Sequence, residues 1–225
     1  MNINRFKVIA LTLCLVGLAA CQSAPQGQDG GAKDVSTKLS AEQTGYYDSD
    51  DIESVVKQSS SLRKEKKYQE ALEVLRPVAN NPDARPDQSF YMEISWVYKM
   101  LGDTDKAEEY IQKAIKAGNT NPDAYFMLGN IMDEKKQPEL AGQAYQKSLD
   151  LLPEHSSHFD KQEIVNALAL ALTAQNKYDE AANLLHDAKD EFPDDQSIER
   201  NIRIITALQQ SNGIPAPKPS SKPQL

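Results

Sequence analysis

The sequence predicts an all-α fold, and three observations carry that prediction. The chain has 225 residues with 33 acidic and 25 basic side chains, giving a formal charge of −8. Glycine and proline are sparse in the middle of the chain and crowded at its ends. Ala107 and Ala141 lie 34 residues apart, and the residues around them align. The length suits one domain with tails, and a fixed period of this size indicates a protein built from repeated units.

Composition also excludes several classes of function. An acidic balance argues against nucleic-acid binding, which needs a basic face to neutralise phosphates. Cys14 and Cys21 lie near the N-terminus and leave no disulfide framework or cysteine metal site downstream. His155 and His158 fall in an expected loop that lacks a rigid frame for a metal. No motif for serine hydrolysis, zinc proteolysis, phosphate loops or dinucleotides is present. We therefore expect no enzyme activity, metal, cofactor or small-molecule substrate.

The first twenty residues have the pattern of a secretory signal. Arg5 and Lys7 precede an uncharged apolar stretch, residues 8–18, that is too short for an ordinary transmembrane helix. The sequence Leu18-Ala19-Ala20-Cys21 then resembles the lipobox of bacterial lipoproteins, in which an aliphatic and two small residues precede a cysteine. Residues 1–20 are therefore expected to be a lipoprotein signal peptide. The alternative is an ordinary cleaved signal peptide with a cysteine placed there by chance.

The lipobox resemblance implies that Cys21 carries a diacylglycerol anchor after cleavage in front of it. Cleavage would remove Arg5 and Lys7, leaving 23 basic against 33 acidic residues and a charge of −10. Gln22 stands where an aspartate usually means retention at the inner membrane. The resemblance therefore implies an outer-membrane anchor facing the periplasm, if the source is Gram-negative. Because anionic headgroups repel an acidic body, we expect membrane contact through the lipid only.

Two flanking segments are expected not to pack. Residues 21–50, the lipidated cysteine and a disordered tether, carry too few large apolar side chains to offset the entropy of ordering. Residues 211–225 contain four prolines and are expected to form an extended tail. Such a tail is either a plain solvated end or a ligand for a groove on a partner.

The region between these segments, residues 51–210, contains four copies of one pattern, in which a small residue precedes an alanine at a set distance. These pairs are Ser59 and Ala71, Ser95 and Ala107, Gly129 and Ala141, and Ala169 and Ala181. Large apolar residues flank them at fixed offsets, and the pattern resembles the tetratricopeptide repeat over residues 52–195. The resemblance implies a right-handed α-solenoid of about four helix-turn-helix repeats.

The same register implies the repeat boundaries, and a following apolar periodicity predicts a C-terminal capping helix. The expected repeats are 52–85, 88–121, 122–155 and 162–195, and the expected cap is 196–210. Pro77 should kink the second helix of the first repeat or end it early. Six extra residues precede the fourth repeat. Turns are expected at 101–103, 135–137 and 175–177, and the small residues should lie where the two helices of a repeat approach closely.

The resemblance also implies a groove lined by the first helices of the repeats, which suits an extended or helical peptide. The positions expected to bind a partner are Met92, Trp96, Lys99, Phe126, Asn130, Asn166 and Leu170, with Val56, Ser60, Arg63, Asp133 and Thr173 beside them. Asn130 and Asn166 would bond the peptide backbone. The alternative is that these side chains, Leu170 above all, pack on one another or under the Tyr46–Tyr47 segment. The basic clamp of chaperone-binding family members is absent.

We therefore expect a lipid-anchored adaptor that holds a protein partner without chemistry. Its build is similar to that of lipoproteins that assist assembly of type IV or Tad-type pili, which implies a secretin subunit or pilus component as partner. One alternative is a scaffold for peptidoglycan hydrolases or synthases. Another is a hydrolase or enzyme accessory, which the lack of nucleophile–base pairs disfavours. Fold alone does not name the partner.

Overall fold

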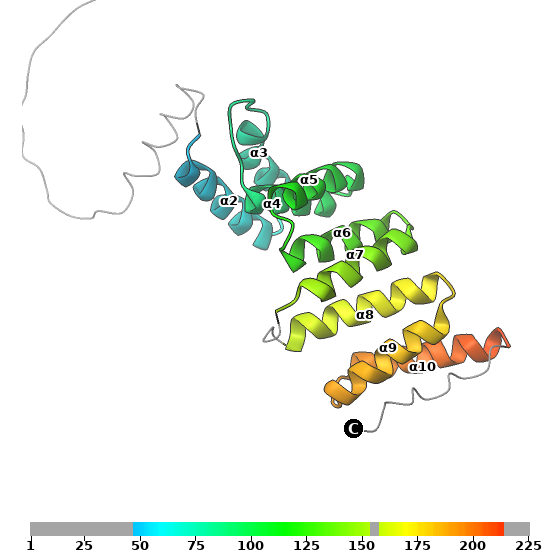
Figure 1. Cartoon of the computed structure of the whole chain (residues 1–225). Coiled ribbons are helices and arrows are strands. Elements are labelled where there is room, and N and C mark those ends of the chain that lie inside the picture. Colours follow the sequence, from blue (N-terminus) through cyan, green and yellow to red (C-terminus); the bar gives the residue numbers. More distant parts are fainter. Residues whose placement is uncertain (1–46, 154–157, 214–225) are drawn as a thin grey trace, which may run out of the picture.

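The computed structural model describes residues 47–153 and 158–213, without the side chains of residues 158–160. The expected signal peptide, Cys21, nearly all of the tether, His155 and the tail from residue 214 lie outside these ranges. The described residues form helices and no strand (Figure 1). The helices are α2 (Ser49–Lys64), α3 (Tyr68–Ala79), α4 (Gln88–Met100), α5 (Thr104–Ala117), α6 (Pro122–Glu134), α7 (Pro138–Leu151), α8 (His158–Ala174), α9 (Tyr178–Glu191) and α10 (Gln196–Ser211).

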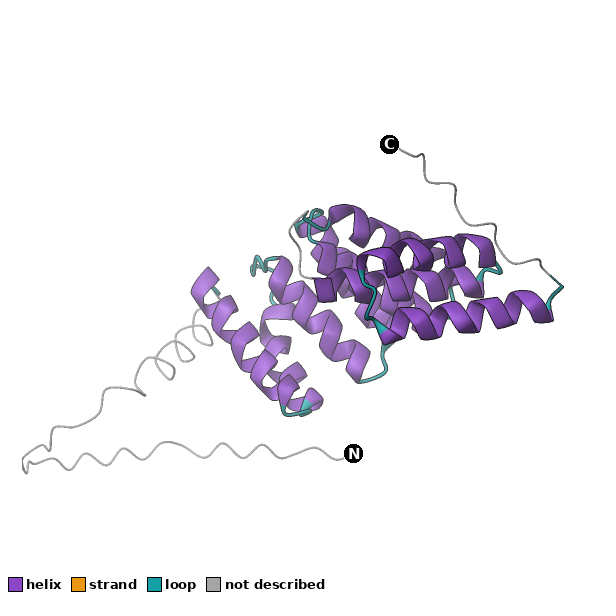
Figure 2. Ribbon diagram, turned by 90° about the horizontal axis from the view of Figure 1, so that it is seen from below, coloured by secondary structure: helices purple, strands orange, loops and turns teal. Residues whose placement is uncertain are grey.

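These helices form four hairpins followed by a single helix. The hairpins are α2–α3, α4–α5, α6–α7 and α8–α9, and α10 packs on α9 and α8. Each hairpin stacks on the next one in chain order (Figure 1), and Figure 2 shows the same stack of helices from below. The all-α solenoid of about four repeats with a capping helix is therefore confirmed. We call α2, α4, α6, α8 and α10 the A helices, and α3, α5, α7 and α9 the B helices.

The A helices lie on the inner side of the curve of the solenoid. α2 packs against α4, α4 against α6, and α8 against α10, whereas successive B helices in the described part of the chain do not pack on one another in this way. A layer whose members touch is shorter than a layer whose members diverge, so the A layer is the inner one. The joint between α6 and α8 differs, because there α7 packs broadly on α8 while α6 and α8 lack the contact seen between the other A helices.

The core follows the solenoid as three successive clusters, so each hairpin is stabilised mainly by its neighbours. Their most buried large side chains are Leu75, Phe90 and Ile94 in the first, Ile111, Ile131 and Tyr145 in the second, and Leu185, Ile198 and Ile205 in the third.

The turn between the A and B helix of every hairpin has the same backbone conformation. One residue of each turn has a positive φ: Lys66 (61°), Gly102 (81°), Lys136 (60°) and Asn176 (62°). The amide of the next residue donates to a carbonyl five positions earlier, as Gln137 does to Met132 at 2.9 Å. This closes each A helix in a Schellman motif. The three turns expected from the sequence are confirmed.

Small residues let the two helices of a hairpin approach closely, as the spacing predicts. At Gly129 of α6, a Cβ atom would lie 2.3 Å from the ring of Tyr145 on α7. The Ser95 hydroxyl on α4 donates to the Ala107 carbonyl on α5 at 2.7 Å. Ala169 of α8 is fully buried. A larger side chain at these positions would push the hairpin open.

Two irregularities of the sequence change helix lengths. α3 continues past Pro77 and has 12 residues, where α5, α7 and α9 have 14 each. α8 begins at His158, four residues before the expected boundary at residue 162, and has 17 residues against 13 in α4 and in α6. Part of the insertion therefore extends α8 and does not form a loop. Lys161 holds this extra turn through an ion pair to Glu191 of α9 at 2.6 Å.

Asp and Asn side chains fix the starts of four A helices, α2, α4, α6 and α10. Asp48, Asp87, Asn121 and Asp195 each accept a hydrogen bond from a backbone amide in the first turn. Because Asp48 accepts from the Asp51 amide at 2.8 Å, α2 begins at Ser49, inside the segment expected to be tether.

Candidate partner-binding face

The residues expected to bind a partner all lie on A helices. We call their shared surface the A-helix face. Its N-terminal half is formed by α2 and α4, and its C-terminal half by α6 and α8 with the adjoining edge of α10. Leu170 is 47% exposed, whereas Met92, Trp96 and Phe126 are half-buried. Leu170 therefore does not have the core packing considered for it, and it lines a hollow between α8 and α10.

The N-terminal half is joined by a buried ion pair. Glu93 of α4 accepts hydrogen bonds from the Ser59 hydroxyl at 2.9 Å and from Arg63 Nε at 3.1 Å, both on α2. The side chain of Glu93 is 8% exposed and that of Arg63 is 24% exposed. The guanidinium of Arg63 also lies 4.5 Å from the centre of the Trp96 ring. The same ring packs on Tyr68 of α3. These contacts hold α2 and α4 together.

Two further groove positions are engaged within the protein. Lys99 forms an ion pair with Glu134 of α6 at 2.6 Å. Met92 receives a contact from the Asn121 amide, whose nitrogen lies 3.6 Å from the Met92 sulfur. Lys99 and Met92 therefore each connect α4 to the next repeat.

At the centre of the face, a tyrosine from the B layer reaches two groove residues. The Tyr145 ring crosses α6 at Gly129, and its hydroxyl is shared between Asn130 Oδ1 at 2.9 Å and Asp133 Oδ2 at 2.8 Å. Burial raises the pKa of Tyr145, and the Asp133 hydrogen bond and the nearby carboxylates of Asp133, Glu134 and Glu163 raise this pKa further. The hydroxyl therefore stays protonated and fixes Asn130 and Asp133. Phe126 lies against the same ring, with centroids 5.6 Å apart.

In the C-terminal half, Asn166 joins α8 to α10. Its Nδ2 donates to the Ser197 hydroxyl at 2.9 Å and to the Gln162 carbonyl at 3.0 Å, while its Oδ1 accepts from Asn201 at 2.7 Å. Asn166 was expected to offer its amide to a peptide backbone, but this amide already forms hydrogen bonds within the protein. For Asn130, by contrast, no described residue accepts a hydrogen bond from Nδ2.

Two hollows lie along the A-helix face. One of about 330 Å³ lies at the N-terminal ends of α2 and α4, and Val56 lines it. Another, of about 350 Å³, lies between α8 and α10 and contains both Asn166 and Leu170. The predicted groove positions are thus brought to one surface, although they contribute to separate hollows.

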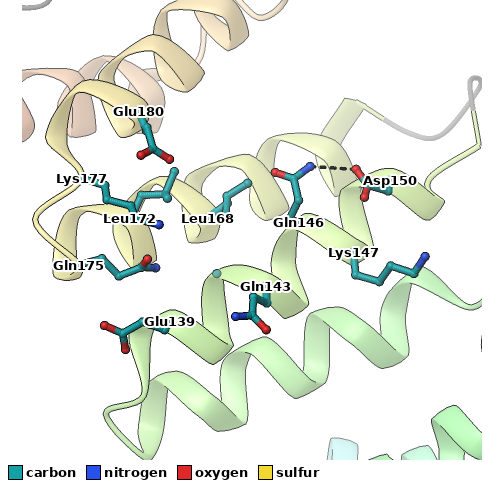
Figure 3. Close-up of a pocket in the computed structure, with 11 residues that line it drawn as sticks. Glu139, Gln143, Gln146, Lys147, Asp150, Leu168, Leu172, Gln175, Lys177 and Glu180 are labelled. Atoms are coloured by element: carbon teal, nitrogen blue, oxygen red, sulfur yellow. Dashed lines mark hydrogen bonds between the residues drawn. The ribbon is translucent and has the colours of Figure 1, made fainter.

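A third hollow of about 500 Å³ lies on the opposite side, between α7 and α9 (Figure 3). Leu168 and Leu172 of α8 form its floor. Its walls are polar, and there Gln146 donates to Asp150 at 2.9 Å. The sequence analysis missed this hollow because its α7 residues recur at the spacing of an ordinary solvated helix face. It also missed Tyr145 as a groove residue. The signal that could have revealed it is the pairing of Gly129 with Tyr145, because a glycine on one helix lets a tyrosine from the other cross it.

The described residues contain no group of three or more His, Cys, Asp or Glu side chains placed to hold a metal. No helix among the described residues is both long and apolar enough to cross a membrane. The A-helix face offers apolar area, amides and carboxylates, which recognise polypeptides.

Comparison with known families gives the class of the protein. Residues 92–156 and residues 163–190 match tetratricopeptide-repeat family models. The chain therefore contains tetratricopeptide repeats, and its fold is the solenoid that such repeats build. Proteins of this class are typically non-enzymatic scaffolds for protein interactions.

One curated protein is similar in sequence to part of the chain. The chain is 23% identical over 118 residues to the type IV pilus assembly protein PilF of Pseudomonas aeruginosa, and the match covers 52% of this chain and 44% of PilF. The chain thus spans less than half the length of this relative.

Solved structures share the fold at low identity. YrrB, described as a tetratricopeptide protein with an unusual peptide-binding site, has a TM-score of 0.61 at 18% identity and covers 77% of this chain and 84% of its own. The APC/C hetero-tetramer Cut9–Hcn1 has a TM-score of 0.58 at 17% identity, over 79% of this chain and 33% of its own.

Proposed function

We propose that this protein is a lipid-anchored adaptor that binds a segment of another envelope protein on its A-helix face and supports assembly of a pilus or its secretin. The observation that carries the proposal is the similarity to PilF, a type IV pilus assembly protein, over 118 residues. The resemblance of residues 18–21 to a lipobox supports a lipid on Cys21, and Gln22 supports the outer membrane. The peptide-binding site recorded for YrrB, which shares the fold, agrees with a polypeptide as ligand.

In this proposal the repeats act by display. The lipid at Cys21 fixes the location, residues 22–46 set the reach, and the A-helix face holds the partner. The exposed Leu170 supplies apolar area, and Asn130 supplies a hydrogen-bond donor that no described residue uses. No bond is made or broken in the partner, so binding alone accounts for the function.

Photo-crosslinking in cells of the source organism tests the partner site. A photoreactive amino acid at Leu170 should give an adduct that contains a pilus or secretin protein. The matched control is Leu140 on α7, which is 48% exposed but does not lie on the A-helix face. Equal adducts at the two positions, or none at Leu170, would contradict binding on this face.

A cysteine substitution tests the anchor. Cys21→Ser should move the protein from the membrane fraction to the soluble periplasm, because the acyl chains would be lost. Cys14→Ser is the control, since residue 14 would be removed with the signal peptide. Membrane attachment that survives Cys21→Ser would refute lipidation at this residue.

A further inference from the structure

α10 carries a stripe of exposed apolar side chains. Ile204 is 45% exposed and Leu208 is 36% exposed, and their spacing of four residues places both on one side of the helix. In each of the four hairpins a B helix follows the A helix and packs on it, whereas α10 is the last described helix. We call Ile204 and Leu208 the α10 stripe.

The α10 stripe adjoins the A-helix face. α8 and α10 run in the same general direction (Figure 1). Asn201 of α10 donates to Asn166 of α8 at 2.7 Å. Ile204 and Leu170 lie one helical turn beyond these two residues, at the same level of the two helices. The stripe therefore begins beside the exposed Leu170.

The backbone after α10 begins the same turn that closes the A helix of every hairpin. Gly213 has a φ of 68°, and its amide donates to the Gln210 carbonyl, three positions earlier, at 3.2 Å. The positive-φ residue of each hairpin turn makes the same bond, as Lys136 does to Asp133 at 3.0 Å. In the hairpins this turn sends the chain back along the A helix that it has just left.

Two side chains hold the end of α10 on α9. Gln209 donates to the Asp179 carboxylate at 2.8 Å, and Asn212 donates to the Tyr178 hydroxyl at 3.2 Å. The turn at Gly213 is therefore anchored by packing on a neighbouring helix. The direction in which the chain leaves α10 is set by these contacts.

The residues that follow the turn suit the α10 stripe. In a Schellman turn, the residue after the positive φ often contacts an apolar side chain in the last turn of the helix, and here that pair is Ile214 and Leu208. Prolines at 215, 217 and 219 exclude a B helix and favour an extended chain. Three extended steps cover roughly 9 Å, whereas Leu208 and Ile204 are separated by about 6 Å along the helix.

We infer that residues 214–217 fold back over the α10 stripe, with Ile214 on Leu208 and the following prolines over Ile204. Because this segment is joined to α10 directly, its local concentration exceeds that of a second copy or a free partner. It takes the position that a B helix takes in the hairpins, and it shields the stripe from other copies as a terminal cap does in repeat proteins. A partner that extends past Leu170 onto α10 has to displace it.

Methyl NMR on the full chain in detergent tests this inference. Cys14 and Cys21 are replaced by serine, and a nitroxide is attached in the variant Ser220→Cys. The Ile204 methyl signal should lose at least twofold more intensity than the Leu208 signals, because the docked chain runs from Leu208 past Ile204. A segment that leaves α10 freely gives the opposite order, since Leu208 lies four residues nearer to the label along the chain.

Two substitutions separate docking from simple proximity. Ile214→Ser should reverse the order of the two signals, because the contact with Leu208 is lost. Leu225→Ser removes an apolar side chain from the same tail outside the docked residues, and should leave the order unchanged. Amide hydrogen exchange at residues 208–211 should accelerate at least fivefold in Ile214→Ser and stay unchanged in Leu225→Ser.

A mixing experiment identifies the occupant of the stripe. Nitroxide-labelled chains are mixed with methyl-labelled chains that carry no nitroxide. Loss of the Ile204 signal in this mixture would place the segment of a second copy on the stripe and overturn the inference. A greater loss at Leu208 than at Ile204 within one chain, or exchange unchanged by Ile214→Ser, would also overturn it. No partner is needed for these measurements, so their outcome does not depend on the proposed function.

Discussion

The two halves of the A-helix face use their polar side chains in different ways. In the N-terminal half, Arg63 and Glu93 are joined in a buried pair, and Lys99 is held by Glu134. In the C-terminal half, Asp133 and Glu163 have no ion pair within the described residues. One repeat pattern therefore joins its helices through ion pairs in one half and through the hydrogen bonds of Tyr145 and Asn166 in the other. The contacts between repeats decide which of the two results.

Removal of a buried cation should have the largest effect and tests the N-terminal half. Arg63→Ala leaves the Glu93 carboxylate buried beside Ser59 without its counter-ion, so we expect a loss of about 3 kcal/mol in the free energy of unfolding. Arg203→Ala on the exposed side of α10 is the control and should change stability by less than about 0.5 kcal/mol. Chemical denaturation measures both. Similar small losses would mean that the pair does not hold α2 to α4.

A methyl group at the helix crossing should have the next largest effect. Gly129→Ala places a Cβ against the buried Tyr145 ring, at 2.3 Å before relaxation. Overpacking costs about 1–3 kcal/mol, and better helix propensity returns only part of this, so we expect a net loss of about 2 kcal/mol. Gly142→Ala is the comparison, because its Cβ would come closest to the Gln175 amide, at 2.9 Å, with Ala171 and Leu168 at 3.9 Å. If Gly129→Ala is neutral in thermal unfolding, the close crossing is wrong.

The Tyr145 hydroxyl offers a smaller and pH-dependent test. Tyr145→Phe removes the bonds to Asn130 and Asp133 and should cost about 1.5 kcal/mol at neutral pH. Because the pKa of Tyr145 is raised in the folded protein, its contribution is complete below the unfolded pKa of about 10 and is lost as pH rises above it. The stability gap between wild type and variant should therefore narrow above pH 10. A gap that widens there would contradict the assigned hydrogen bonds.

The smallest expected effect has the opposite sign and applies to both halves. Lys66 and Lys136 have positive φ, which costs a side chain about 1 kcal/mol and glycine almost nothing. Lys136→Gly should therefore raise stability by about 0.5–1 kcal/mol, and Lys66→Gly by a similar amount. Glycine at Lys116, inside α5, is the control and should destabilise. Differential scanning calorimetry can resolve these shifts.

Much of the fold follows from the sequence because it is periodic. A turn like that at Lys136 and a helix crossing like that at Gly129 recur at the same spacing along the chain. The backbone geometry of the hairpin requires both. The start of α8 was less predictable, because the insertion before it lies outside the 34-residue register of the repeats.

The exposure and hydrogen bonding of side chains on the A-helix face were hard to predict, because each side chain is contacted by residues of another repeat. Ser59 meets Glu93 across 34 residues, and Asn166 meets Asn201 across 35. Apolar character alone placed Leu170 with Phe126, yet one is exposed and the other packs on Tyr145. Such differences arise from contacts between helices, which a pattern along one helix does not contain.

The uniform turns and the irregular joint before α8 together suggest how this architecture tolerates change. The three-residue link inside a hairpin has one permitted backbone, so added length there would break the Schellman closure. The link from a B helix to the next A helix has no such requirement, and here it absorbs extra residues as a helical turn. A change in the length of that link alters the spacing of neighbouring A helices, while every hairpin keeps its internal packing. The size of the ligand that the face accepts can therefore change while the core stays the same.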